Sequence, residues 1–137
     1  MRQPTAHDLV YAWHTEAMVE VRRVGRERAS LPVHNEPQCG WFGTMLVRKG
    51  AWVPARVWLD QPIDEVGELA GDEILRCEVD GRERDAGEQW LFLCQQPISE
   101  REFDHMTALR RWQRVNAPYE YSAAWKPVDH LKTPISE

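Results

Sequence analysis

The run from Trp52 to Leu59 constrains the fold of this chain more than any other stretch. Its odd-numbered positions are all aliphatic, whereas its even-numbered positions hold Trp52, Pro54, Arg56 and Trp58. A period of two is typical of a β-strand that turns one face toward an apolar core. The chain must therefore contain a sheet, and other elements must cover the apolar face of that sheet.

The residues before this strand predict its partner. A second β-like run starts at Trp41, and Arg48-Lys49-Gly50-Ala51 separates the two runs. Polar residues and a glycine between two such runs favour a hairpin with Gly50 in the turn. Because Pro54 has no N–H to donate, we expect its strand to lie at a sheet edge or to carry a bulge.

Residues 74–95 predict the rest of the sheet. Apolar and charged residues alternate over 75–79, and Asp80-Gly81 follows, a dipeptide that favours a type I′ hairpin turn. We expect a return strand around Arg82–Asp85 and a last, buried strand at Trp90–Cys94. The result is a small, mainly antiparallel sheet of four or five strands.

Residues 5–21 predict an N-terminal helix. Thr5 and Asp8 resemble a capping box, and apolar residues recur at every fourth position from Leu9 to Val21. Residues 25–40 then lose all periodicity and collect glycine, proline and asparagine. Such a composition is typical of an irregular connection.

A second helix is expected from Glu100 to Asn116. Ser99 is a favourable N-cap and Glu102 completes a capping box. We expect the more apolar half of this helix to pack against the sheet, with Arg110 in solvent on the other half. That apolar half consists of Met106, Ala108, Leu109, Trp112 and Val115. Pro118 ends the helix, and we expect residues 118–137 to form an extended tail.

These elements fit a single α+β domain over residues 1–137, in which the sheet packs with an N-terminal and a C-terminal helix. The segments are a helix (1–24), a connection (25–40), the sheet (41–95), a helix (98–117) and the tail (118–137). No apolar run is long enough to span a membrane, and the N-terminus does not resemble a signal peptide. We expect a location in the bacterial cytoplasm, where Cys39, Cys77 and Cys94 stay reduced.

Arginine and tryptophan supply the candidate binding residues. The net charge is −5, yet residues 22–56 hold seven basic side chains against two acidic ones. Alternating guanidinium groups and aromatic rings can stack on bases or anchor a protein partner. The candidates are Trp41, Arg48, Trp52, Arg56 and Trp58 on the strand surface, and Arg22, Arg23, Arg26 and Arg28 in the basic segment. The alternative is that the second helix covers the strand surface and makes its tryptophans part of the core.

No familiar catalytic motif occurs in the sequence. It has no phosphate-binding glycine loop, nucleophile elbow, zincin helix or Cys-x-x-Cys pair. His34 and Cys39 could form a base and a nucleophile, and His105 could bind a metal, but we expect structural roles for all three. The acidic loop 60–73 lacks the spacing of an EF-hand. We therefore expect no enzyme activity, no cofactor and no bound metal.

Five segments resemble a known family. They are Gly40-Trp41-Phe42, Leu46-Val47-Arg48-Lys49-Gly50, Trp52-Val53-Pro54-Ala55-Arg56-Val57-Trp58, Cys77-Glu78-Val79-Asp80-Gly81 and Pro97-Ile98-Ser99-Glu100. Across residues 36–118 the chain resembles small proteins encoded by tailed phages and prophages of proteobacteria. The resemblance implies a phage setting. It transfers no activity and no catalytic residue.

Together these observations favour a phage-type accessory protein that acts by non-enzymatic protein binding. The expected partner is a protein of the host or of the phage particle, and inhibition of a host defence system is one role of this kind. The alternatives are a nucleic-acid-binding protein in phage genome handling and a minor assembly protein. The acidic total charge opposes binding to a phosphate backbone unless the basic segment is well segregated. We expect no membrane partner, and the sequence leaves the oligomeric state open.

Overall fold

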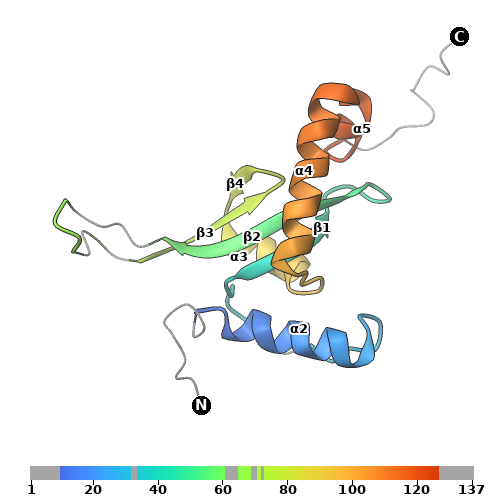
Figure 1. Ribbon diagram of the computed structural model, residues 1–137. Coiled ribbons are helices and arrows are strands. Elements are labelled where there is room, and N and C mark those ends of the chain that lie inside the picture. Colours follow the sequence, from blue (N-terminus) through green and yellow to red (C-terminus); the bar gives the residue numbers. More distant parts are fainter. Residues whose placement is uncertain (1–9, 32–33, 61–64, 69–70, 72, 127–137) are drawn as a thin grey trace, which may run out of the picture.

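The computed structural model describes residues 10–31, 34–60, 65–68, 71 and 73–126. Its centre is a four-stranded antiparallel sheet in which sequence order and spatial order agree (Figure 1). The strands are β1 (Gly40–Met45), β2 (Trp52–Asp60), β3 (Ile74–Val79) and β4 (Arg82–Arg84). The helices are α2 (Ala12–Val24), α3 (Ala86–Leu93), α4 (Glu100–Asn116) and α5 (Pro118–Ala123). The predicted α+β class is confirmed.

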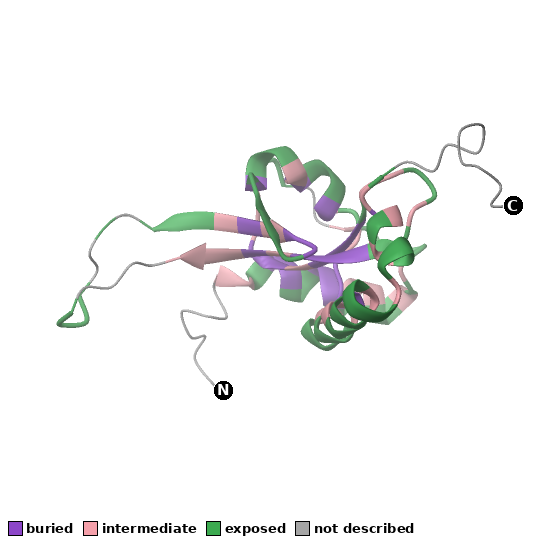
Figure 2. Cartoon of the chain, turned by 90° about the horizontal axis from the view of Figure 1, so that it is seen from above, coloured by how far each residue is buried: buried purple, intermediate pink, exposed green. Residues whose placement is uncertain are grey.

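The predicted apolar face of β2 is the centre of the core. Val53, Ala55 and Val57 are all buried there. Trp13 of α2 and Trp90 of α3 pack on this face with ring centroids 5.1 Å apart. Helix α4 lies on the opposite face, where its residues and Pro54 line one pocket. Figure 2 shows the buried residues concentrated along the sheet, between helices on its two sides.

The prediction that Pro54 marks an edge strand or a bulge is wrong. Strand β2 pairs with β1 on one side and β3 on the other, in continuous register. The Gly43 N–H donates to Gln96 O, away from β2, so its partner Pro54 turns its nitrogen toward β3. The β2–β3 ladder ends one pair before Pro54, at Ala55 and Val79. A central strand accepts this proline because no ladder hydrogen bond is lost.

Both predicted hairpins are present. Asp80 and Gly81 have φ angles of 52° and 79°, which is the left-handed pair that a type I′ turn requires. In the β1–β2 turn it is Lys49, with φ of 61°, that takes the left-handed conformation. Gly50 is needed for space, because a Cβ atom there would lie 2.5 Å from Val47 Cγ2.

The prediction of a strand at Trp90–Cys94 is also wrong, because these residues belong to helix α3 and its C-terminal end. The helix begins after Asp85, whose side chain accepts a hydrogen bond from the Glu88 N–H. Trp90 and Leu93 are buried, whereas Leu91 and Phe92 are 72% and 61% exposed. The buried residues of α3 recur every three or four positions, as in a helix, whereas a central strand would be buried continuously.

The predicted N-terminal helix is present as α2, which spans Ala12–Val24. The proposed cap at Thr5 lies outside the described residues. His14 fastens the helix to the rest of the fold, because its Nε2 lies 3.1 Å from Trp41 O and 2.7 Å from Ile98 O. Arg26, just beyond the helix, donates to Pro97 O. The N-terminal helix is thus attached to the segment that precedes α4.

Helix α4 begins as predicted, with the complete Ser99–Glu102 capping box. Its orientation is the reverse of the prediction. Arg110 is buried, whereas Leu109, Trp112 and Val115 are exposed. Helix α4 turns Arg110 toward the sheet because Asp80, in the turn between β3 and β4, accepts hydrogen bonds from it.

The predicted extended tail is helical at its start. Pro118 occupies the first turn of α5, which spans Pro118–Ala123 and contacts α4. Proline suits that position because a first-turn residue needs no N–H donor. Ala124 is buried against the core. The remainder of the predicted tail, 127–137, lies outside the described residues.

Candidate functional site

A stacked group of one tryptophan and two arginines lies on the sheet face that carries α4. The Arg56 guanidinium lies 4.3 Å from the centre of the Trp58 ring, and that of Arg76 lies 5.7 Å from it. We call Arg56, Trp58 and Arg76 the Trp–Arg plate. A guanidinium within about 6 Å of an indole ring is attracted to its face.

Carboxylates fix both arginines of the plate. Arg56 donates to Glu78 at 2.9 Å, and Arg76 donates to Asp60 at 2.9 Å and to Glu83 at 2.6 Å. Hydrogen bonds to Asp60 and Glu83 raise the pKa of Arg76. The arginine side chains are still about 40% exposed. The two arginines of the plate are therefore held in place and partly open to solvent, and their three carboxylate partners outnumber them by one.

Of the other predicted residues of this face, Trp41 neighbours the plate, whereas Trp52 and Arg48 lie apart from it. Trp41 pairs with Arg56 in the strand register, but its ring stacks on Tyr11 at 4.8 Å. Trp52 is 50% exposed, and the buried Pro54 under α4 lies between it and Arg56. Arg48 is exposed in the β1–β2 turn, beyond the Met45–Trp52 pair. Helix α4 thus covers the middle of the face and divides it.

The basic segment 22–28 does not form one cationic patch. Arg23 is paired with Glu20 at 2.7 Å, and Arg26 is engaged with Pro97 O. Arg22 and Arg28 are exposed. Two of the four arginines are thus held by contacts within the chain, which weakens the case for nucleic-acid binding through this segment.

A buried ion pair holds α4 on the sheet. Asp80 and Arg110 are 8% and 5% exposed. The carboxylate of Asp80 accepts from Arg110 Nε at 2.9 Å, from Arg110 Nη2 at 2.8 Å and from Trp125 Nε1 at 2.7 Å. Arg110 also donates to Gln113 and to Tyr121 O. We call Asp80, Arg110 and Trp125 the clasp, because they join the β3–β4 turn, α4 and the residues after α5.

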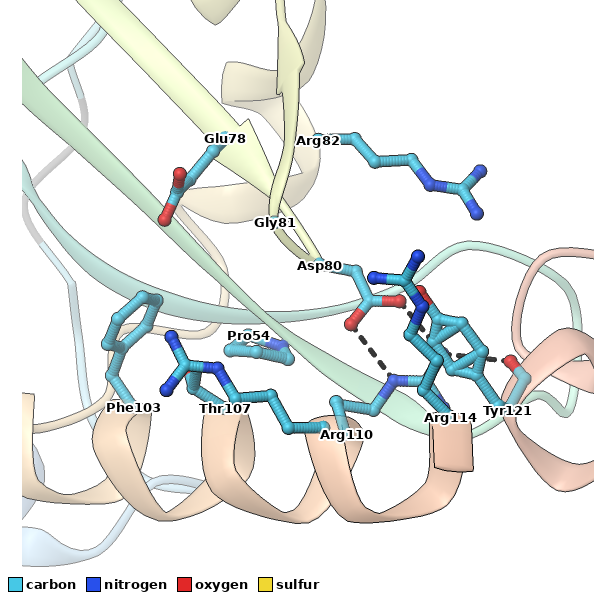
Figure 3. Close-up of a pocket in the computed structure, with 11 residues that line it drawn as sticks. Pro54, Glu78, Asp80, Gly81, Arg82, Phe103, Thr107, Arg110, Arg114 and Tyr121 are labelled. Carbon is cyan, nitrogen blue, oxygen red and sulfur yellow. Dashed lines mark hydrogen bonds and ion pairs between the residues drawn. The ribbon is translucent and has the colours of Figure 1, made fainter. Parts of the chain in front are cut away.

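Beside the clasp lies a half-open pocket of about 460 Å³ (Figure 3). One wall comes from the sheet and includes Pro54 of β2, Glu78 of β3 and Arg82 of β4. The other wall comes from α4 and α5 and consists of Phe103, Thr107, Arg110, Arg111, Arg114 and Tyr121. Figure 3 shows Arg82 and Arg114 on opposite sides, with Asp80 between the walls. The Arg56–Glu78 pair connects the pocket to the Trp–Arg plate.

The pocket is cationic although the chain is acidic. The charge of Arg110 is balanced by Asp80, and Glu78 is balanced by Arg56. Arg82 stacks on Trp125 at 3.8 Å, a contact that leaves its positive charge in place. Within the described part of the chain, Arg82, Arg111 and Arg114 form no ion pair. Three positive charges therefore face this pocket without a carboxylate partner.

The thiols are not activated for catalysis. Burial raises the pKa of Cys39 and of Cys77 to about 11, whereas a catalytic thiol needs a lowered pKa. His34 is exposed, and its Nδ1 faces the Glu36 N–H rather than Cys39. His105 is exposed on α4.

The described residues contain no cluster of metal-ligating side chains. The acidic loop 60–73 lies partly outside the described residues, so the expectation that it binds no metal stays a prediction. The three cysteines are free thiols, as expected.

Sequence reasoning found the plate residues Arg56 and Trp58 but missed the pocket. The signal on α4 was the spacing of Thr107, Arg111 and Arg114, which are four and then three residues apart and share one side of a helix. The opposite wall, with Arg82, gave no local signal. Only the docking of α4 brings the two walls together.

The fold and this surface define a small α+β domain with an arginine-lined pocket next to a flat aromatic plate. Comparison with protein-family models, curated proteins and solved structures gave no match. No helix in the described ranges is long and apolar enough to cross a bilayer.

Proposed function

We propose that the chain is a non-enzymatic binding protein that occupies a surface of a partner protein through the Trp–Arg plate. The observation that carries this proposal is the half-exposed, pre-formed stack of Arg56 on Trp58, fixed by Glu78. Tryptophan and arginine dominate the residues that supply binding energy at protein interfaces.

Rigidity supports this use of the plate. Long side chains normally lose conformational entropy when they bind, at about 0.5–1.5 kcal/mol for each immobilised side chain. Arg56 and Arg76 are already held by three carboxylates and one ring before a partner arrives. A partner that stacks on the plate therefore avoids much of this entropic cost.

The mixed charges around the plate favour a protein partner over a nucleic acid. Asp60, Glu78 and Glu83 surround the two arginines of the plate. A phosphate backbone would meet these carboxylates, whereas a protein surface can match both signs of charge. The resemblance to phage-encoded proteins makes a host protein or a particle component the first partner to test, and a host defence factor falls in that class.

The test compares three tagged variants with the unaltered chain in affinity capture from bacterial host lysate, with quantitative mass spectrometry. Arg56→Ala and Trp58→Ala alter the plate. Trp112→Ala is the matched control, because Trp112 is 57% exposed on the outer side of α4. We expect the same partner to be captured by the unaltered chain and by Trp112→Ala, and to be lost from both plate variants.

Binding to the purified partner then gives the energy and the type of contact. We expect each plate variant to fold normally and to weaken binding by about 1–3 kcal/mol, mainly through faster dissociation. A partner that binds Trp58→Ala as tightly as the unaltered chain would refute the proposal. Loss of binding in Trp112→Ala alone would assign the interface to the outer side of α4 instead.

A further inference from the structure

We propose that the pocket between α4 and the β3–β4 hairpin binds a small molecule that carries a phosphate group. This site is separate from the protein-binding role of the plate. The proposal rests on the size and lining of the pocket and on its excess positive charge.

The residues that line the pocket carry an excess of positive charge. Arg82, Arg111 and Arg114 line the pocket and have no carboxylate partner among the described residues, in a chain whose net charge is −5. Like charges that face one cavity repel one another, and a bound anion removes that repulsion. The planar guanidinium group also matches the oxygen pairs of a phosphate, with which it can form two parallel hydrogen bonds.

The nearest carboxylates do not compete for these arginines. Asp80 already accepts three hydrogen bonds from Arg110 and Trp125, and it is buried. Glu78 is engaged by Arg56. The clasp and the Arg56–Glu78 pair thus leave the three remaining arginines available to an external anion.

The size and the lining of the pocket indicate more than a free ion. A volume of about 460 Å³ falls in the range of small-molecule sites, roughly 300–1,000 Å³. Phe103, Pro54 and Tyr121 supply apolar surface next to the arginines. A phosphate with an attached flat or apolar group fits this combination of charge and apolar lining.

Thr107 adds a polar group to the α4 wall. Its Oγ1 is buried and has no hydrogen-bond partner among the described residues. An unsatisfied hydroxyl is costly to bury, so native proteins rarely keep one without a use. The α4 wall of the pocket thus holds one polar group whose hydrogen bond is not made within the described part of the chain.

The experiment is isothermal titration calorimetry of the full chain with AMP, with pyrophosphate and with adenosine, in a phosphate-free buffer. AMP and adenosine differ only in the phosphate group, so their comparison isolates its contribution. We expect AMP and pyrophosphate to bind and adenosine not to bind. Binding should weaken as the salt concentration rises, because exposed charges are screened.

Arg111→Gln and Arg114→Gln test the site. Neither side chain has a hydrogen bond or ion pair within the described part of the chain, so both variants should keep the unfolding temperature of the unaltered protein. We expect each to weaken AMP binding about tenfold or more, the loss of one charge-assisted contact. Arg101→Gln is the control, because it removes the same charge from α4 outside this pocket.

Two results would overturn the proposal. One is the absence of binding by both AMP and pyrophosphate, or equal binding of AMP and adenosine. The other is an equal loss of affinity in Arg101→Gln and Arg114→Gln, which would assign the effect to total charge. Because none of these variants alters the Trp–Arg plate, failure here would leave the proposed protein binding intact.

Discussion

Replacement of Asp80 by asparagine is expected to destabilise the fold more than any other single substitution of similar volume. Asparagine keeps the shape of the side chain and tolerates the φ angle of 52° at this turn position. The substitution therefore isolates the loss of the negative charge. It leaves the Arg110 guanidinium buried without its counter-ion.

The magnitude follows from the burial of the pair. Asp80 and Arg110 are 8% and 5% exposed, and two hydrogen bonds of 2.8 and 2.9 Å join them. Removal of one partner from such a buried pair costs about 3–5 kcal/mol, because the other charge stays desolvated. A domain of this size has a total stability of about 5–15 kcal/mol, so the loss is a large fraction of the whole.

Urea unfolding followed by tryptophan fluorescence measures this cost. We expect a lower midpoint with an unchanged slope, which indicates a change in stability alone. Glu78→Gln breaks the half-exposed pair with Arg56 and is the control, with an expected cost below about 1 kcal/mol. The double variant Asp80→Asn with Arg110→Met should be more stable than the sum of the single effects, because it removes the unpaired charge. A loss below about 1 kcal/mol for Asp80→Asn would show that the clasp does not hold α4 in place.

Two further predictions concern the ends of α4 and α2. Ser99→Ala should lower the free energy of unfolding by about 1 kcal/mol, because Ser99 Oγ accepts the Glu102 N–H at 3.0 Å, and urea unfolding measures the change. An unchanged midpoint would mean that the cap contributes nothing. Burial lowers the pKa of His14 below its ordinary value of 6.5, so the unfolded chain takes up a proton more readily than the folded one. The stability that neutral His14 contributes is thus present above pH 6.5 and is lost as the pH falls below it. The urea midpoint should drop between about pH 7.5 and about pH 5.5, and it should drop less in His14→Gln; equal drops in both proteins would contradict this account.

Local chemistry predicted those parts of the fold that depend on a few adjacent residues. The Asp80-Gly81 turn and the Ser99 cap were both found, because each follows from backbone and side-chain groups within four residues. The alternation of β2 fixed which of its residues face the core. The sequence predicts these features because their main determinants are adjacent residues or a simple alternation.

The wrong predictions concern elements whose structure depends on residues far away in the sequence. The apolar run at Trp90 suits a buried strand or a helix equally by hydrophobicity, although Asp85 and Glu88 offered a helix-start signal. The burial of Arg110 depends on Asp80, thirty positions earlier, and no periodicity within α4 reveals that pair. Two of the plate residues, Arg56 and Trp58, were among the predicted binding residues, whereas Arg76 was not. The division of this face by α4 and the pocket beneath the helix follow from the same distant contact.

The attachment of α2 has a consequence for biosynthesis. His14 reaches both Trp41 O and Ile98 O, and Arg26 reaches Pro97 O. During synthesis, helix α2 therefore lacks part of its docking surface until the residues just before α4 have been translated. Helix α2 has 13 residues. An isolated helix of that length is only marginally stable in water. The described part of the fold therefore cannot be completed in the order of synthesis, because α2 can form its last contacts only after Pro97 and Ile98 have been made.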